Sequence, residues 1–351
     1  MLLYIHIPYC DSKCYYCNFN SYTSMGGTKK DYIKALKIDL KFQLEKLNIK
    51  RGDIRSIFIG GGTPSTISSI QYRDIFKTLK PFLKQNSEIT IEANPNSASK
   101  DWLNGMFELG VNRISFGVQS FDSKKLKTLN RRHSAKEAIL AVENASKVGF
   151  KNISIDLIYG LAYDTKELLK EDIKIAFDLP INHISTYELT IEKNTKFSQT
   201  PNMKKDDENL GYFIRDEIVK RGFKWYEVSN YGKYQSIHNI GYWQLKEYIG
   251  VGAGAVGFLR NKRLYSSNNI LEYIKNPIKR EIEELSQENI LMERIFLGLR
   301  SRVGIPKEIL NSNMQKRANI LVKENKLKIE NGIYKNINYF LSDELALFLL
   351  D

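Results

Sequence analysis

Short apolar runs and longer amphipathic stretches alternate along most of the chain, at intervals of roughly 30 residues. Nearly every apolar run ends in a polar or glycine-rich segment, which is typical of a β-strand followed by a loop. The runs predict strands at residues 2–8, 55–60, 88–93, 113–119, 152–158, 183–189 and 225–228.

Apolar residues recur at helical spacing between these runs. In the first such stretch they are Tyr32, Leu36, Leu40, Leu44 and Leu47. The same reasoning predicts helices at residues 30–47, 69–84, 100–109, 135–147, 166–177 and 207–220.

A strand, helix, strand order at this interval favours parallel βα units, and therefore an α/β fold. Such units close into a complete or partial (β/α) barrel, in which the carboxyl ends of the strands carry the chemistry. We predict a partial (β/α)6 TIM-like barrel whose six strand ends meet on one face.

The βα rhythm fades after residue 230 into a glycine- and aromatic-rich stretch. From Gln287 onwards, apolar residues at helical spacing predict a smaller, mainly helical C-terminal domain, whose apolar positions we interpret as its own core. The expected organisation is a core barrel at 1–232, a connector at 233–285 and a small C-terminal domain at 286–351.

All three cysteines of the chain, Cys10, Cys14 and Cys17, follow the first predicted strand with C-x3-C-x2-C spacing. Thiolates this close in sequence can converge on one inorganic centre. An iron–sulfur cluster with one iron left open is the leading interpretation. Zinc with a borrowed ligand and incidental thiols remain alternatives, whereas an odd cysteine count argues against a disulfide framework.

This spacing, with the aromatic Tyr16 before the third cysteine, resembles the radical S-adenosylmethionine (radical SAM) enzymes. The preceding Tyr-Ile-His-Ile-Pro-Tyr-Cys narrows the resemblance to the oxygen-independent coproporphyrinogen III oxidase-like family. The resemblance implies a radical SAM barrel, a [4Fe–4S] cluster on the three cysteines, and S-adenosyl-L-methionine (SAM) bound to the fourth iron.

The resemblance also implies a SAM pocket built from the strand ends. The alternative interpretations are that the glycines only form a tight turn and that the tyrosines only pack in the core. Glu92 is notable by itself, because a carboxylate within a strand needs a partner if it is buried. The implied pocket residues are Tyr4, Tyr16, Gly61, Gly62, Thr63, Glu92, Gln119, Arg131 and Asp156.

Two further positions bear on function within that family. The coproporphyrinogen III dehydrogenases carry a fourth cysteine where this chain has Phe19. The segment from His238 to Trp243 matches the HNxxYW motif of the HemW-type haem chaperone branch, which implies haem binding by His238, Tyr242 and Trp243. An imidazole can ligate haem iron and aromatic rings can cover a porphyrin, although a hydrogen-bonded structural histidine is the alternative.

The expected function is therefore to accept haem and hand it to apo-haemoproteins such as membrane respiratory enzymes. A small electron donor of the flavodoxin or ferredoxin type would reduce the cluster, which could then cleave SAM to methionine and a 5′-deoxyadenosyl radical. The rival expectation is an enzyme that oxidatively decarboxylates coproporphyrinogen III.

The net charge of +13 changes this picture little, because the lysines alternate with acidic residues along the predicted helices. We expect no nucleic acid partner, since no basic arm or recognition motif is present. The longest apolar stretch, 249–259, is too short to span a bilayer, and nothing resembles a signal peptide. We therefore expect a cytoplasmic protein.

Overall fold

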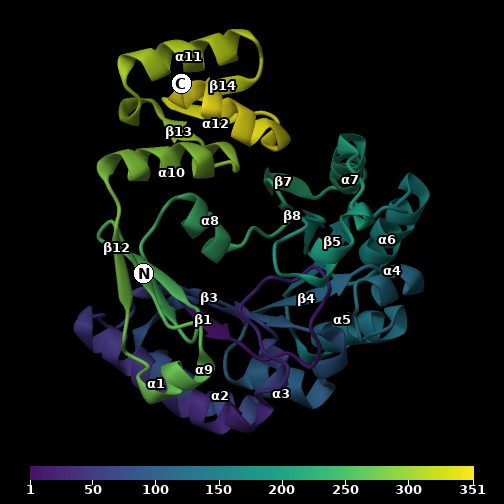
Figure 1. Ribbon diagram of the computed structural model, residues 1–351, viewed down its shortest axis with the longest axis vertical. Helices are drawn as coiled ribbons and strands as arrows, with labels where there is room; N and C mark the ends of the chain where they lie inside the picture. The colour runs from purple at the N-terminus through teal and green to yellow at the C-terminus, as the bar shows by residue number, and fades with distance from the viewer.

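One twelve-stranded β-sheet runs through most of the chain, which the computed structural model describes over residues 1–351 (Figure 1). Its central strands are parallel neighbours in chain order, as a series of βα units requires. The predicted partial (β/α)6 barrel is confirmed. These strands are β1 Leu2–Ile7, β2 Ile54–Gly61, β3 Leu83–Ala93, β4 Arg113–Gln119, β5 Asn152–Tyr159 and β6 His183–Glu188.

Helices that connect these strands cover the outer face of the sheet (Figure 1). Their apolar sides and the sheet enclose a core of 53 buried residues. Capping boxes begin two of the helices, at Ser68 with Gln71 and at Ser134 with Glu137. The helices are α1 Lys29–Lys46, α2 Ser69–Leu79, α3 Lys100–Glu108, α4 Ser123–Thr128, α5 Ala135–Val148, α6 Lys166–Asp178 and α7 Glu208–Lys220.

The helix predicted for 69–84 ends earlier, at Leu79. Pro81 lacks a backbone N–H and disfavours helical geometry in the residue before it. Residues 80–82 therefore form a short 3-10 turn, and β3 already begins at Leu83.

Further strands extend both edges of the sheet. At one edge β9 Tyr248–Val251 pairs in parallel with β1, and β10 Val256–Leu259, β11 Lys262–Tyr265 and β12 Glu281–Glu284 follow in antiparallel order. At the other edge β8 Asn230–Gly232 lies between β6 and β7 Lys224–Glu227. The strands at 248–284 were not predicted, because each is only four residues long and the segment is rich in glycine.

Helix α8, Ile237–Trp243, lies on the inner face of the sheet, between the sheet and the C-terminal helices (Figure 1). The Glu88 side chain of β3, which is only 2% exposed, fixes its start. The Glu88 carboxylate accepts hydrogen bonds from Tyr234 Oη, Ser236 Oγ and the backbone N–H groups of Ile237 and His238, at 2.8 to 3.2 Å. One buried carboxylate thus anchors α8 against the barrel interior.

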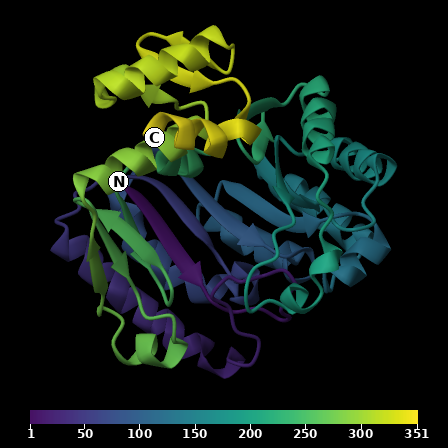
Figure 2. The same cartoon turned by 45° about the horizontal axis from the view of Figure 1, so that its top comes forward.

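The C-terminal residues form a separate unit with its own core of 11 buried residues (Figure 2). The predicted helices are present, and a small three-stranded sheet that was not predicted joins them. The elements are α10 Gln287–Leu299, β13 Ile305–Pro306, α11 Ser312–Lys323, β14 Leu327–Glu330, β15 Ile333–Asn336 and α12 Ser342–Leu350, and α9 Ile270–Lys275 precedes them.

No helix combines the length and the apolar content that crossing a lipid bilayer demands.

Replacing Glu88 with alanine should lower the free energy of unfolding by about 3 kcal/mol, because several buried donors lose their acceptor. Urea denaturation measures this loss. The matched control is Glu137→Ala, which removes an exposed capping glutamate and should cost about 1 kcal/mol or less. Equal losses in the two variants would contradict the anchoring role of Glu88.

Candidate functional site

The cysteine loop leaves the carboxyl end of β1 and returns beside it. Its two ends are paired, because Tyr22 N donates to Pro8 O at 2.8 Å and Cys10 N donates to Tyr22 O at 3.1 Å. Within the loop, Cys17 N donates to Cys14 O at 3.2 Å. All three cysteines line one cavity of about 400 Å³. The three thiols therefore face one common cavity, as the sequence predicts.

Two side chains from other elements contact the thiols. Arg131 Nη1 lies 3.2 Å from Cys14 Sγ, and Thr63 Oγ1 lies 3.3 Å from Cys10 Sγ. Burial raises the pKa of the Cys10 and Cys17 thiols. A cluster or metal binds the thiolate form, so its binding would release protons from these two thiols.

The remaining cavity walls come from the carboxyl ends of the parallel strands. Beside the cysteines, the cavity is lined by Tyr16, Gly61, Gly62, Thr63, Glu92, Asn94, Gly117, Gln119, Arg131, Asp156 and Tyr187, among others. The structure thus brings together all but one of the residues that the sequence predicted for the cluster and SAM. The exception is Tyr4, which does not line the cavity.

Tyr4 points toward neighbouring side chains on β1 and β2. Its hydroxyl lies 2.9 Å from His6 Nδ1, and its ring stacks on Phe58 at 6.3 Å. His6 Nε2 lies 2.9 Å from the carbonyl oxygen of Asn20, which can only accept, so Nε2 carries the proton and Tyr4 donates to Nδ1. Tyr4 therefore supports His6, which holds the end of the cysteine loop.

The glycines at the carboxyl end of β2 are needed for close packing against β1. A Cβ on Gly61, whose φ is +110°, would lie 2.4 Å from the His6 ring, and one on Gly62 would lie 2.8 Å from Tyr9 O. Any larger residue at these two positions would therefore clash with the protein itself. The Gly61 N–H donates a hydrogen bond to Glu92 Oε2 at 3.2 Å.

Two half-buried carboxyl groups, of Glu92 and Asp156, face the cavity from β3 and β5. Burial and the neighbouring Asp156 raise the pKa of Glu92 to about 8, and burial also raises the pKa of Asp156. Ser115 Oγ donates to Asp156 Oδ1 at 3.3 Å. Such acceptors suit a ligand that brings hydroxyl or ammonium donors, because its binding would satisfy groups that are costly to leave buried and charged.

Arg131 connects the cysteine loop to two strand ends. Its Nη2 donates to Asn94 Oδ1 at 2.7 Å and to Gly117 O at 2.6 Å, while Nε is buried without a partner. Asn94 also donates to Thr63 Oγ1 at 3.2 Å. The sequence did not single out Asn94 as a site residue, although its place directly after a predicted strand was a usable signal.

The donor set fits the cluster and SAM that the sequence implies. Three thiols would supply one ligand each to three irons of a [4Fe–4S] cluster, and the fourth iron would be left without a protein ligand. No group of three or more histidine, cysteine, aspartate or glutamate side chains is arranged to hold a single metal ion.

The residues of the HNxxYW motif lie elsewhere, on α8, and none of them lines the cysteine cavity. His238 is 0% exposed, and its Nδ1 lies 2.9 Å from Ser56 Oγ near the start of β2. Burial lowers the pKa of His238 to about 3, so the ring is neutral. Its Nε2 and the indole nitrogen of Trp243 are buried without partners, and the Tyr242 ring packs edge-on against the imidazole at 4.7 Å.

The chain is similar in sequence and in fold to known proteins. Residues 4–176 match the radical SAM superfamily. The heme chaperone HemW of Lactococcus lactis is 37% identical over 86% of this chain and 82% of its own length. The heme chaperone HemW of Haemophilus influenzae is 33% identical over 99% of this chain and 98% of its own.

Among solved structures, the coproporphyrinogen III oxidase HemN of Escherichia coli, a radical SAM enzyme, superposes with a TM-score of 0.82. The alignment covers 99% of this chain and 89% of that chain at 19% identity, and it supports the shared fold alone. The sequence relatives carry the assignment further: the chain belongs to the heme chaperone HemW family of the radical SAM superfamily.

Proposed function

We propose that this protein binds haem and transfers it to apo-haemoproteins, including respiratory enzymes at a membrane. The observation that carries the proposal is the 33% identity to a named heme chaperone along 99% of the chain. Membership of the radical SAM superfamily implies a [4Fe–4S] cluster and SAM as resident cofactors.

The chain would divide these tasks among its parts. We propose that residues 1–232 hold the cluster and SAM, that residues 233–285 carry the haem motif, and that residues 286–351 form a smaller domain that packs on α8 through α10.

In the cavity, Cys10, Cys14 and Cys17 would hold the cluster, and its open iron would bind the amino and carboxylate groups of SAM. A reduced cluster supplies one electron for cleavage of SAM. The chain's own groups would bind and orient the rest of the ligand. They are Glu92 for the ribose hydroxyls, and Tyr16, Gly61, Gly62, Thr63, Gln119, Arg131 and Asp156 around it.

For haem, the proposed ligand is His238 Nε2, with Tyr242 and Trp243 against the porphyrin. In the tautomer in which Nδ1 donates to Ser56 Oγ, the neutral imidazole has an unprotonated Nε2, which is the form that binds iron, and this nitrogen has no partner in the protein. Since His238 is fully buried, α8 has to leave the inner face of the sheet before haem can reach this nitrogen. The hydrogen bonds to Glu88 contribute to the energetic cost of that step.

The rival function is oxidative decarboxylation of coproporphyrinogen III. At the position where those dehydrogenases carry a fourth cysteine, this chain places Phe19 at the edge of the cavity with 63% exposure. We propose that the chain lacks this activity. An anaerobic assay of the reconstituted protein that yields protoporphyrinogen would overturn the proposal.

A second cavity, of about 290 Å³, suits the entry of electrons. Cys10 lines both this cavity and the cysteine cavity, so the second one reaches the same thiol from outside. Lys29 and the exposed Arg132 supply positive charge there, beside a single acid, Asp11. We propose this surface for a small acidic electron donor of the flavodoxin or ferredoxin type.

The haem assignment predicts opposite effects for two variants. His238→Ala should weaken haem binding by about tenfold or more and remove the spectrum of a histidine-ligated haem. Glu88→Gln should speed haem uptake, because a neutral amide holds α8 less firmly. Haem titration followed by stopped-flow absorbance measures both effects.

His133→Ala is the control for the haem experiment, because it removes another buried histidine, one that lies outside the motif. Transfer to an apo-cytochrome tests the function itself. Wild-type protein that binds no haem would contradict the chaperone proposal. Unchanged haem binding and an unchanged spectrum in His238→Ala would instead show that haem binds at another part of the molecule.

SAM affinity should rise with pH. The ribose hydroxyls donate hydrogen bonds to the ionised form of Glu92, so binding favours loss of its proton. Because the pKa of Glu92 is raised to about 8, affinity should be lost as pH falls below about 8 and should level off above it. Calorimetric titration between about pH 6.5 and 9.5 tests this, and Glu92→Gln should flatten the profile.

Reversing the charge of Arg132 should slow reduction of the cluster by an acidic electron-transfer protein by about tenfold at low salt. Stopped-flow reduction measures the rate. Reduction by dithionite should not change, and Lys316→Glu, an equal charge change on exposed α11, should have little effect. Equal slowing in both variants would argue against a docking surface at Arg132.

A further inference from the structure

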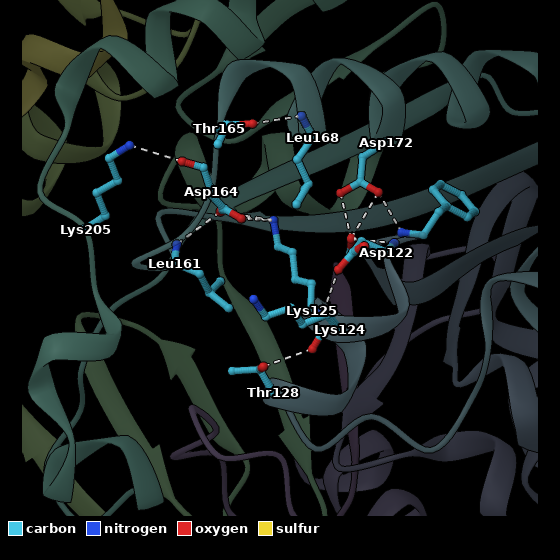
Figure 3. Close-up of polar contacts among 12 residues, drawn as sticks. Asp122, Lys124, Lys125, Thr128, Leu161, Asp164, Thr165, Leu168, Asp172 and Lys205 are labelled. Carbon is cyan, nitrogen blue, oxygen red and sulfur yellow. Dashed lines mark hydrogen bonds and ion pairs between the residues drawn. The ribbon is translucent and has the colours of Figure 1, made fainter.

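Helix α4 contains a lysine in a place where lysine is rare. The Lys125 side chain is 0% exposed, as is that of its partner Asp164. Its ammonium lies 3.0 Å from each carboxylate oxygen of Asp164 (Figure 3). Removing one member of such a pair leaves the other charge buried without compensation.

Asp164 belongs to the loop between β5 and α6 and also holds that loop in shape. Its Oδ2 accepts a hydrogen bond from Leu161 N at 3.0 Å, and its backbone oxygen accepts one from Lys205 Nζ at 3.1 Å (Figure 3). Nearby, Asp172 of α6 accepts hydrogen bonds from Ser120 Oγ and Phe121 N, just after β4. The ion pair therefore ties α4 to a frame in which the loops after β4 and β5 are both fixed.

The residues after α4 reach the cysteine loop. Leu129 O accepts a hydrogen bond from Tyr15 N at 3.3 Å, Asn130 Nδ2 donates to Lys13 O at 2.8 Å, and Arg131 contacts Cys14 Sγ. We call residues 129–131 the brace. Its position follows from α4, because Leu129 N donates to Lys125 O at 3.0 Å and Arg131 N donates to Leu126 O at 2.9 Å.

Neither the brace nor the cysteine loop is stable by its own structure. Helix α4 has only six residues, far fewer than an isolated helix needs. The loop from residue 10 to residue 21 contains no helix or strand. A small buried cluster below the loop includes Leu129 and Leu161, with Tyr16 packed against it, and this cluster spans the same two segments that the ion pair joins.

We propose that Lys125 is a positioning residue for the iron–sulfur cluster. Through its pair with Asp164 it fixes α4, and α4 fixes the brace that holds Lys13, Cys14 and Tyr15 in the geometry that receives the cluster. The inference rests on the cluster of the radical SAM superfamily and does not depend on haem transfer.

The test measures how long the cluster is retained in protein that stays folded. After anaerobic reconstitution, Lys125→Met should lose its iron to a chelator about tenfold faster than wild type, or more. The spectrum of the reduced cluster should change, and its reduction potential should shift, because Arg131 no longer holds a fixed place beside Cys14. Iron content, absorbance at cluster wavelengths, electron paramagnetic resonance and redox titration supply these readouts.

Two further variants separate positioning from general stability. Lys125→Met combined with Asp164→Asn also lacks the ion pair but leaves no uncompensated buried charge, so it should fold and still lose iron faster than wild type, and it answers the question if Lys125→Met alone does not fold. Leu79→Ala opens a cavity in the main core near the start of β3, away from the strand ends that line the cysteine cavity. It should lower global stability and leave the cluster spectrum, potential and retention unchanged.

Wild-type retention and potential in Lys125→Met would overturn the inference, and so would cluster loss in Leu79→Ala that matches its loss of stability. Neither of these results would contradict the assignment of a cluster and SAM to this protein. A wild-type protein that takes up no cluster at all would refute the cofactor assignment, and this inference with it.

Discussion

The guanidinium of Arg131 is the interaction on which the arrangement of the cysteine cavity depends. It donates to groups from three different segments: Cys14 in the cysteine loop, Asn94 after β3, and the carbonyl oxygen of Gly117 in β4. A planar group with several fixed donors can hold such partners in one relative orientation, which lysine cannot do. The thiols and the strand ends that line the cavity are thereby held in one relative orientation before any ligand binds.

The protein separates its two proposed tasks along the strands of one sheet. The cysteine cavity lies at the carboxyl ends of the parallel strands, whereas α8 contacts Ser56 near the start of β2 and Glu88 in the middle of β3. Neither site uses residues of the other. A haem bound at α8, as proposed above, would therefore not compete with SAM for these residues.

The sequence was sufficient for features that depend on local pattern. Apolar runs predicted β1 to β6, and cysteine spacing predicted the cavity-lining thiols. The short strands β9 to β12 escaped prediction because four residues carry little periodicity and their pairing is decided by distant segments. The burial of His238 also depends on a distant segment, because its partner Ser56 lies 182 residues away in the chain, and so the local sequence could not predict it. Lys125, in the sequence Ser-Lys-Lys-Leu-Lys, has every local mark of a surface lysine, and only the tertiary structure shows that it is buried.

The pairing of β1 with β9 has a consequence for biosynthesis. The strand that delivers the cysteines needs residues 248–251 as its second neighbour, and the Asn20 side chain at the end of the cysteine loop donates to the carbonyl oxygens of Ala253 and Asn268. A nascent chain on the ribosome presents its cysteines early but cannot complete their surroundings until more than two thirds of the protein has emerged. Loading of the cluster is thus expected late in synthesis or after release, when the loop has gained its last supports.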